Sequence, residues 1–99
     1  MLNIQKTNEN GTLTVALEGR LDTASSPKLE TELNNALPGV QDLVFDLEKL
    51  EYISSAGLRV LLLAQKAMNR QGSMKLVRVN DIVREVLEVT GFTEILTIE

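Results

Sequence analysis

Alternating apolar and polar residues predict two strands at the start of the chain. Residues 12–18 alternate cleanly, the pattern of a strand with one buried face. Residues 2–6 alternate more weakly and predict an edge strand. Asn10-Gly11 lies between the two segments and suits the positive φ angles of a tight turn. The segments are therefore expected to form an antiparallel hairpin.

The clearest helical pattern follows the serine pair Ser54-Ser55. Apolar residues recur there at i, i+3, i+4 and i+7 and form one stripe of a helix: Gly57, Val60, Leu61, Ala64, Ala67 and Met68. A hydroxyl of Ser54 or Ser55 is the expected N-cap, because it can accept a hydrogen bond from an unpaired backbone N–H. A phosphate at this helix start would meet free N–H donors and the positive end of the helix dipole.

Two more helices are predicted by their end signals. Residues 27–37 form the first, with a proline in its opening turn and either Thr23 or Ser26 as its N-cap. The second begins at a cap formed by Asn80 or Asp81 and is closed by Gly91. Its expected core face consists of Ile82, Val83, Val86 and Leu87.

Three further apolar segments complete a single α/β domain. Residues 43–47 are nearly continuous in apolarity, typical of a strand covered on both faces, and residues 74–79 and 94–98 predict two more strands. The order over residues 1–99 is then β-β-α-β-α-β-α-β. Strands that alternate with helices pair in parallel through right-handed crossovers, so we expect a mostly parallel sheet with helices largely on one face.

The loops after the second and third strands, residues 19–23 and 48–56, are expected to meet at one edge of that sheet. Asp22 and Ser55 are then close in space, and Asp22 is expected to be exposed with no packing role. The two serines have two interpretations at this point. They only cap the helix, or they form a site that a phosphate or a partner can approach.

The other charged residues are expected to lie on the solvated surface of the domain. The acidic residues Asp46, Glu48 and Glu51 lack the spacing of metal ligands, so no metal site is predicted. Arg59 begins an exposed basic stripe of the central helix and is expected to contact an acidic partner. Of Leu62 and Leu63 beside it, one is expected either to contact a partner or to pack against the last helix.

Composition excludes several classes of function. The chain has 99 residues, 43% of them hydrophobic and 24% charged, as in ordinary globular domains, and it has no Cys and no His. Thiol catalysis, a Ser-His-Asp triad and an imidazole zinc site are therefore excluded, and with no enzyme motif we expect neither catalysis nor a cofactor. A net charge of −4 argues against nucleic-acid binding. Without a membrane span or a signal-peptide pattern, the expected location is the cytoplasm.

Four motifs resemble the STAS domain, specifically that of bacterial anti-sigma factor antagonists: G-R-L-D at 19–22, F-D-L at 45–47, Y-I-S-S-A-G-L at 52–58 and G-F at 91–92. The resemblance implies a protein that binds an anti-sigma factor serine kinase, so that a sigma factor is released. It also implies that the kinase phosphorylates one serine at the start of the second helix, and that a PP2C-type phosphatase reverses this. Counting back from Gly57, the acceptor is Ser55, with Ser54 as the alternative; Ser54 stands where the family motif has an acid.

The predicted partner surface follows from this resemblance and from the helix pattern. It consists of Asp22, Ser54, Ser55, Ala56, Gly57 and Arg59. Three alternatives remain open: a STAS scaffold that is never phosphorylated, an accessory domain of a lipid or lipoprotein transport system, and a small-ligand sensor.

Overall fold

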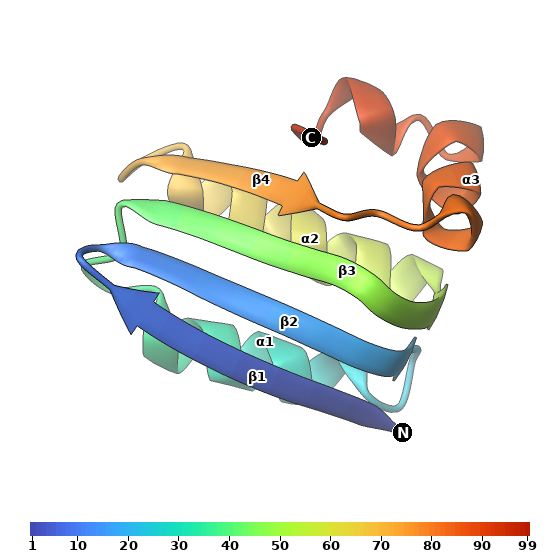
Figure 1. Ribbon diagram of the computed structural model, residues 1–99, viewed down its shortest axis with the longest axis horizontal. Coiled ribbons are helices and arrows are strands. Elements are labelled where there is room, and N and C mark those ends of the chain that lie inside the picture. Colours follow the sequence, from blue (N-terminus) through green and yellow to red (C-terminus); the bar gives the residue numbers. More distant parts are fainter.

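Four strands form one mixed sheet in the computed structural model, which describes residues 1–99 (Figure 1). The strand order is β1-β2-β3-β4. β1 (Leu2–Glu9) and β2 (Thr12–Leu21) pair antiparallel, whereas β3 (Asp42–Ile53) and β4 (Ser73–Val77) extend the sheet in parallel. The hairpin turn has φ angles of 52° at Asn10 and 85° at Gly11. The predicted hairpin and the mostly parallel sheet are confirmed.

Three helices accompany the sheet: α1 (Ser26–Ala36), α2 (Ser55–Met68) and α3 (Asp81–Val89). α1 and α2 lie against one face, and α3 lies beside the ends of β3 and β4 (Figure 1). The core forms between that face and the helices, and its fully buried side chains include Val15, Phe45, Leu61 and Leu87. No helix is both long and apolar enough to cross a membrane.

β3 differs from the prediction in its length and in the number of its faces that helices cover. Leu43, Phe45 and Leu47 are buried while the residues between them are partly exposed, so helices cover one face and not both. The strand also runs on to Ile53, because residues 49–53 pair with the end of β2 beyond an irregularity in register. Most of the expected loop at 48–56 is therefore strand.

The expected strand at residues 94–98 is absent. Gly91 adopts a φ of 80°, and the chain then forms a short 3₁₀ helix, η1 (Phe92–Glu94). Only one parallel bridge, between Leu76 and Ile98, joins the C-terminal residues to β4. Glu94 lies in η1 and Ile95 caps it, so the strand cannot begin there; Leu96 is buried, whereas Ile95 is exposed.

The N-cap of α1 is neither of the two predicted residues. Ser25 occupies the N-cap position, rather than Thr23 or Ser26, and its side chain makes no capping hydrogen bond to the helix. Pro27 lies in the first turn, as predicted. The hydroxyl of Ser25 instead turns back towards the end of β2.

Candidate partner-binding site

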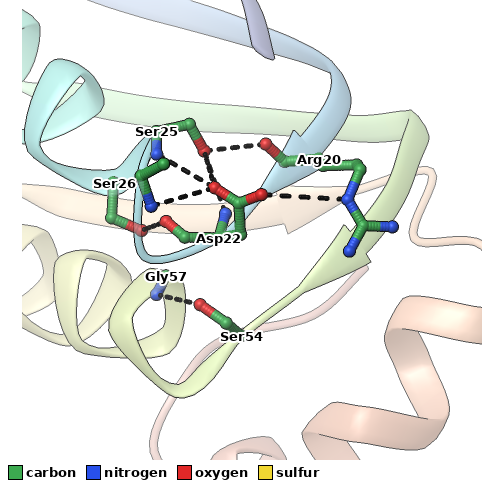
Figure 2. A network of polar contacts seen from close by, with 7 residues as sticks. Arg20, Asp22, Ser25, Ser26, Ser54 and Gly57 are labelled. Atoms are coloured by element: carbon green, nitrogen blue, oxygen red, sulfur yellow. Dashed lines mark hydrogen bonds and ion pairs between the residues drawn. The ribbon is translucent and has the colours of Figure 1, made fainter. Parts of the chain in front are cut away.

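The two serines at the start of α2 have different roles. Ser54 is the N-cap, with an extended backbone, and its Oγ accepts a hydrogen bond from the Gly57 N–H at 3.3 Å (Figure 2). Ser55 is the first helical residue, is exposed, and makes no side-chain hydrogen bond within the protein. The prediction that a serine caps this helix is confirmed, and the capping residue is Ser54. Ser55 is left with a free hydroxyl at the positive end of the helix dipole.

Close packing fixes this helix start against the sheet. The Ser54 N–H donates to the Leu21 carbonyl at 2.9 Å, which joins the end of β3 to the end of β2. Gly57 is buried, and a Cβ added to it would lie 2.7 Å from Cγ of Leu21 and 3.0 Å from Cγ1 of Ile53. Only a residue without a side chain allows the first turn of α2 to lie this close to the two strands.

Asp22 organises the loop between β2 and α1, contrary to the expectation of an exposed residue without a structural role. Its Oδ1 accepts hydrogen bonds from the N–H groups of Ala24 and Ser25 at 3.1 and 3.0 Å. Its own N–H donates to Ser25 Oγ at 2.9 Å, and its carbonyl accepts from the Ser26 hydroxyl (Figure 2). The side chain is 31% exposed. The Ser25 N–H and hydroxyl, helped by the Ala24 N–H and nearby Arg20, lower the pKa of the Asp22 carboxyl.

Arg20 and Tyr52 form a stacked pair that the sequence did not reveal. They lie opposite one another in the register of β2 and β3, and the guanidinium carbon is 4.2 Å from the centre of the Tyr52 ring. Arg20 Nε also lies 3.8 Å from Oδ2 of Asp22. The sequence shows an arginine near the end of β2 and a tyrosine near the end of β3, which could have suggested such a pair. Their contact depends on the register of the two strands.

The acidic residues near the site do not form a cluster around the serines. Asp46 instead pairs with Arg78, whose Nε lies 3.2 Å from Oδ2, and Glu48 lies 3.5 Å from the same guanidinium. The hydrogen bond from Arg78 lowers the pKa of Asp46. No group of three or more carboxylates has the arrangement of a metal site.

The outer face of α2 presents one charged and one apolar side chain near the site. Arg59 is exposed one turn after Ser55, as expected of a solvated stripe. Leu63 is 40% exposed and lines a shallow groove with Leu33 of α1 and with Leu37, the C-cap of that helix. The predicted packing of this side chain against the last helix is therefore not observed, because its apolar neighbours across the groove lie at α1. Of the predicted surface, Ser55 and Arg59 are exposed, Asp22, Ser54 and Ala56 are half-buried, and Gly57 is buried.

Residues 3–99 match the family model of the STAS domain. The chain belongs to the STAS family. BtrV of Bordetella bronchiseptica, which carries the name of an anti-sigma factor antagonist, is 41% identical over 91 residues, covering 90% of this chain and 78% of that protein. An anti-sigma F factor antagonist of Paenibacillus polymyxa is 31% identical over 98% of this STAS chain and 86% of that protein.

Solved structures share the fold over nearly the whole STAS domain. An anti-sigma factor antagonist from Mycobacterium paratuberculosis superposes with a TM-score of 0.90 at 20% identity, covering 99% of this chain and 85% of that one. SpoIIAA in its unphosphorylated form superposes with a TM-score of 0.84 at 19% identity, covering 98% and 88%. The strand order and the position of α2 are therefore those of known STAS domains.

Proposed function

We propose that this STAS domain is an anti-sigma factor antagonist, which binds an anti-sigma factor and so releases a sigma factor. The names of the relatives support this assignment, since the match covers most of their length. The proposed contact surface is formed by Asp22, Ser54, Ser55, Ala56, Gly57 and Arg59. It lies at the edge where β2 and β3 end and α2 begins, a position that partner sites favour in α/β sheets.

The observation that carries a regulatory role is the free hydroxyl of Ser55. Ser54 is engaged as the cap, so a serine kinase can reach Ser55 without breaking a hydrogen bond of the fold. In this proposal the anti-sigma factor is itself that kinase, and a PP2C-type phosphatase restores the active form. Both reactions then take place in the cytoplasm.

Phosphorylation would act by local occlusion. A phosphate adds about −1.5 to −2 charges at neutral pH, and the start of α2 would stabilise it by ~1 kcal/mol. The free domain therefore has no reason to change shape. At an interface the same group adds bulk and repels facing carboxylates, and a penalty of about 3–5 kcal/mol would weaken binding by roughly two to three orders of magnitude or more.

A second function, a STAS scaffold that is never phosphorylated, is favoured by one specific feature. Ser54 stands where the family motif has an acid, and it serves as a cap in place of a carboxylate. A kinase that recognises the acid would find no such group here. The scaffold would use the same surface but would not be switched.

A binding titration tests the proposal. Each anti-sigma factor encoded in the genome of the source organism is purified and titrated separately with the wild-type domain. We expect one of them to bind and to release its sigma factor, measured as recovery of transcription from a promoter that this sigma factor uses. If none binds, the antagonist assignment is wrong.

A further inference from the structure

The C-terminal part of the chain exposes an unusual share of aliphatic surface. Six large hydrophobic side chains are exposed in the whole molecule, and three of them lie between residues 82 and 95. Ile82 is 62% exposed, Val89 is 80% exposed and Ile95 is 51% exposed. Single exposed aliphatic residues are normal, but several on one short segment indicate a contact surface.

α3 carries two apolar stripes, only one of which is fully buried; in the other, Val86 alone packs against the core. Val83 and Leu87 are fully buried and hold the helix against the core. Ile82, Val86 and Val89 recur at i, i+4 and i+7 and form a second stripe, offset from the first. Ile82 and Val89, at its two ends, are the exposed members, and Val86 between them is half-buried. The prediction that Ile82 belongs to the core face is therefore wrong.

The net charge of the protein is concentrated in the same segment. Residues 81–99 carry five carboxylate side chains and one arginine, a net charge of −4. Residues 1–80 carry nine acidic and nine basic side chains and are neutral, so this segment accounts for the whole formal charge of −4. Asp81, Glu85 and Glu88 of α3 are all exposed. The second stripe is therefore an apolar strip bordered by carboxylates.

α3 is fixed to the strand that leads to the serines. Asn80 Oδ1 accepts from the Val83 N–H at 3.0 Å and caps the helix. Its Nδ2 donates to the carbonyls of Leu47 and Leu50 in β3 at 3.1 and 2.7 Å. Ser54 follows about 13 Å further along the same extended chain, at roughly 3.3 Å per residue. A single partner can therefore contact both α3 and the start of α2, which lie towards the same end of the sheet (Figure 1).

We propose that the exposed stripe of α3 is a second docking surface for the anti-sigma factor, and that the partner presents a basic amphipathic helix to it. The inference rests on the proposed function. An apolar helix face with basic borders would cover Ile82 and Val89 while its cations meet Glu85 and Glu88. A second copy of this chain is the wrong occupant, because it would bring two surfaces of net charge −4 together. Ser55 lies outside this surface, so phosphorylation of Ser55 leaves the α3 surface itself unchanged.

The test uses the full-length protein and each purified anti-sigma factor of the source organism in titration calorimetry. The apolar variant is Ile82→Ser with Val89→Ser, and the charge variant is Glu85→Lys with Glu88→Lys. Glu9→Lys and Glu30→Lys are the matched controls, since these exposed residues lie on β1 and α1, outside both proposed surfaces. Melting temperature and circular dichroism establish that each variant is folded.

We expect both α3 variants to weaken binding at least tenfold while the controls bind like the wild type, and we expect the charge variant to lessen the dependence of affinity on salt. Wild-type affinity in both folded α3 variants would overturn this inference and leave the proposed function standing. A wild type that binds no anti-sigma factor would refute the proposed function and this inference with it. Self-association of the wild type that Ile82→Ser with Val89→Ser abolishes, seen by sedimentation, would assign the surface to a second copy and also overturn the inference.

Discussion

At the scale of single residues, two adjacent serines are chemically alike but differ in position. The Ser54 hydroxyl is used by the backbone of α2, and the Ser55 hydroxyl is free. The same contrast applies to the aspartates. Asp22 holds a loop through backbone N–H groups, whereas Asp46 holds a side chain, Arg78. What each residue can do for a partner depends on what it already does for the fold.

Ser54→Ala is expected to lower the free energy of unfolding by about 0.5–2 kcal/mol, because it removes an N-cap. Ser55→Ala is expected to change it very little, since its hydroxyl has no partner in the fold. Urea denaturation at neutral pH compares the two variants. An equal loss in both would contradict the division of roles between the serines.

Asp22→Ala is expected to destabilise the domain in a pH-dependent manner. The pKa of Asp22 is lowered in the folded state, chiefly by the Ser25 N–H and hydroxyl. The carboxylate therefore contributes its full stability above the pKa of the unfolded chain, about 3.9, and loses that contribution as the pH falls through the folded-state pKa. The difference in melting temperature between wild type and variant should be largest at neutral pH and shrink in acid. A difference that grows in acid would show that the carboxylate is not stabilised by this loop.

At the scale of elements, three parts of α2 have different surroundings. One side is buried against the sheet, the first turn touches the ends of β2 and β3, and the outer side presents Arg59 to solvent. The next two predictions test the first turn and the opposite sides of the helix.

The substitution Gly57→Ala has two opposing effects on stability, a gain in helix propensity and a loss from overpacking. Alanine gains up to about 1 kcal/mol over glycine in a helix, but its methyl group would lie 2.7 Å from Cγ of buried Leu21. Overpacking of this kind costs about 1–3 kcal/mol, so we expect a net destabilisation of roughly 1 kcal/mol. A higher urea midpoint in Gly57→Ala would show that the two strands can move away from α2.

Leu61→Ala should destabilise the domain by about 2–5 kcal/mol, because the side chain is fully buried and its loss leaves a cavity. Arg59→Glu should leave stability nearly unchanged and alter affinity for an acidic surface on the partner. Thermal unfolding of both variants, with titration against the anti-sigma factor, separates the two effects. A larger shift in melting temperature for Arg59→Glu than for Leu61→Ala would reverse the assigned faces of α2.

At the scale of the whole molecule, periodicity predicted the layers better than the ends of the elements. The stripe from Gly57 to Met68 and the alternation at 12–18 correspond to α2 and to most of β2. The end of β3 was missed because residues 48–52 are mainly polar and pair only through an irregular register. The last strand was wrong because the same apolar spacing suits a 3₁₀ turn once Gly91 adopts a positive φ.

The meeting of the two loops was predicted, but the contacts within and between them were not. The strand pattern predicted that the loops around Asp22 and Ser55 meet at one edge of the sheet, and the structure joins them through Leu21 and Ser54. The spacing of Asp22 and Ser25 was a signal for a hydrogen-bonded loop, since short polar side chains accept from backbone N–H groups a few residues on. The Arg20–Tyr52 stack depends on strand register, which no local pattern specifies.

Mass spectrometry of the incubated domain distinguishes a switch at Ser55 from a scaffold that is never phosphorylated. The wild type, Ser54→Ala and Ser55→Ala are each incubated with the anti-sigma factor that binds the domain and with ATP, and the modified residue is located by mass spectrometry. We expect one phosphate on Ser55 in the wild type and in Ser54→Ala, none in Ser55→Ala, and loss of binding by the phosphorylated forms. Phosphate on Ser54 in the wild type, or tight binding with no phosphate on either serine, would contradict this expectation.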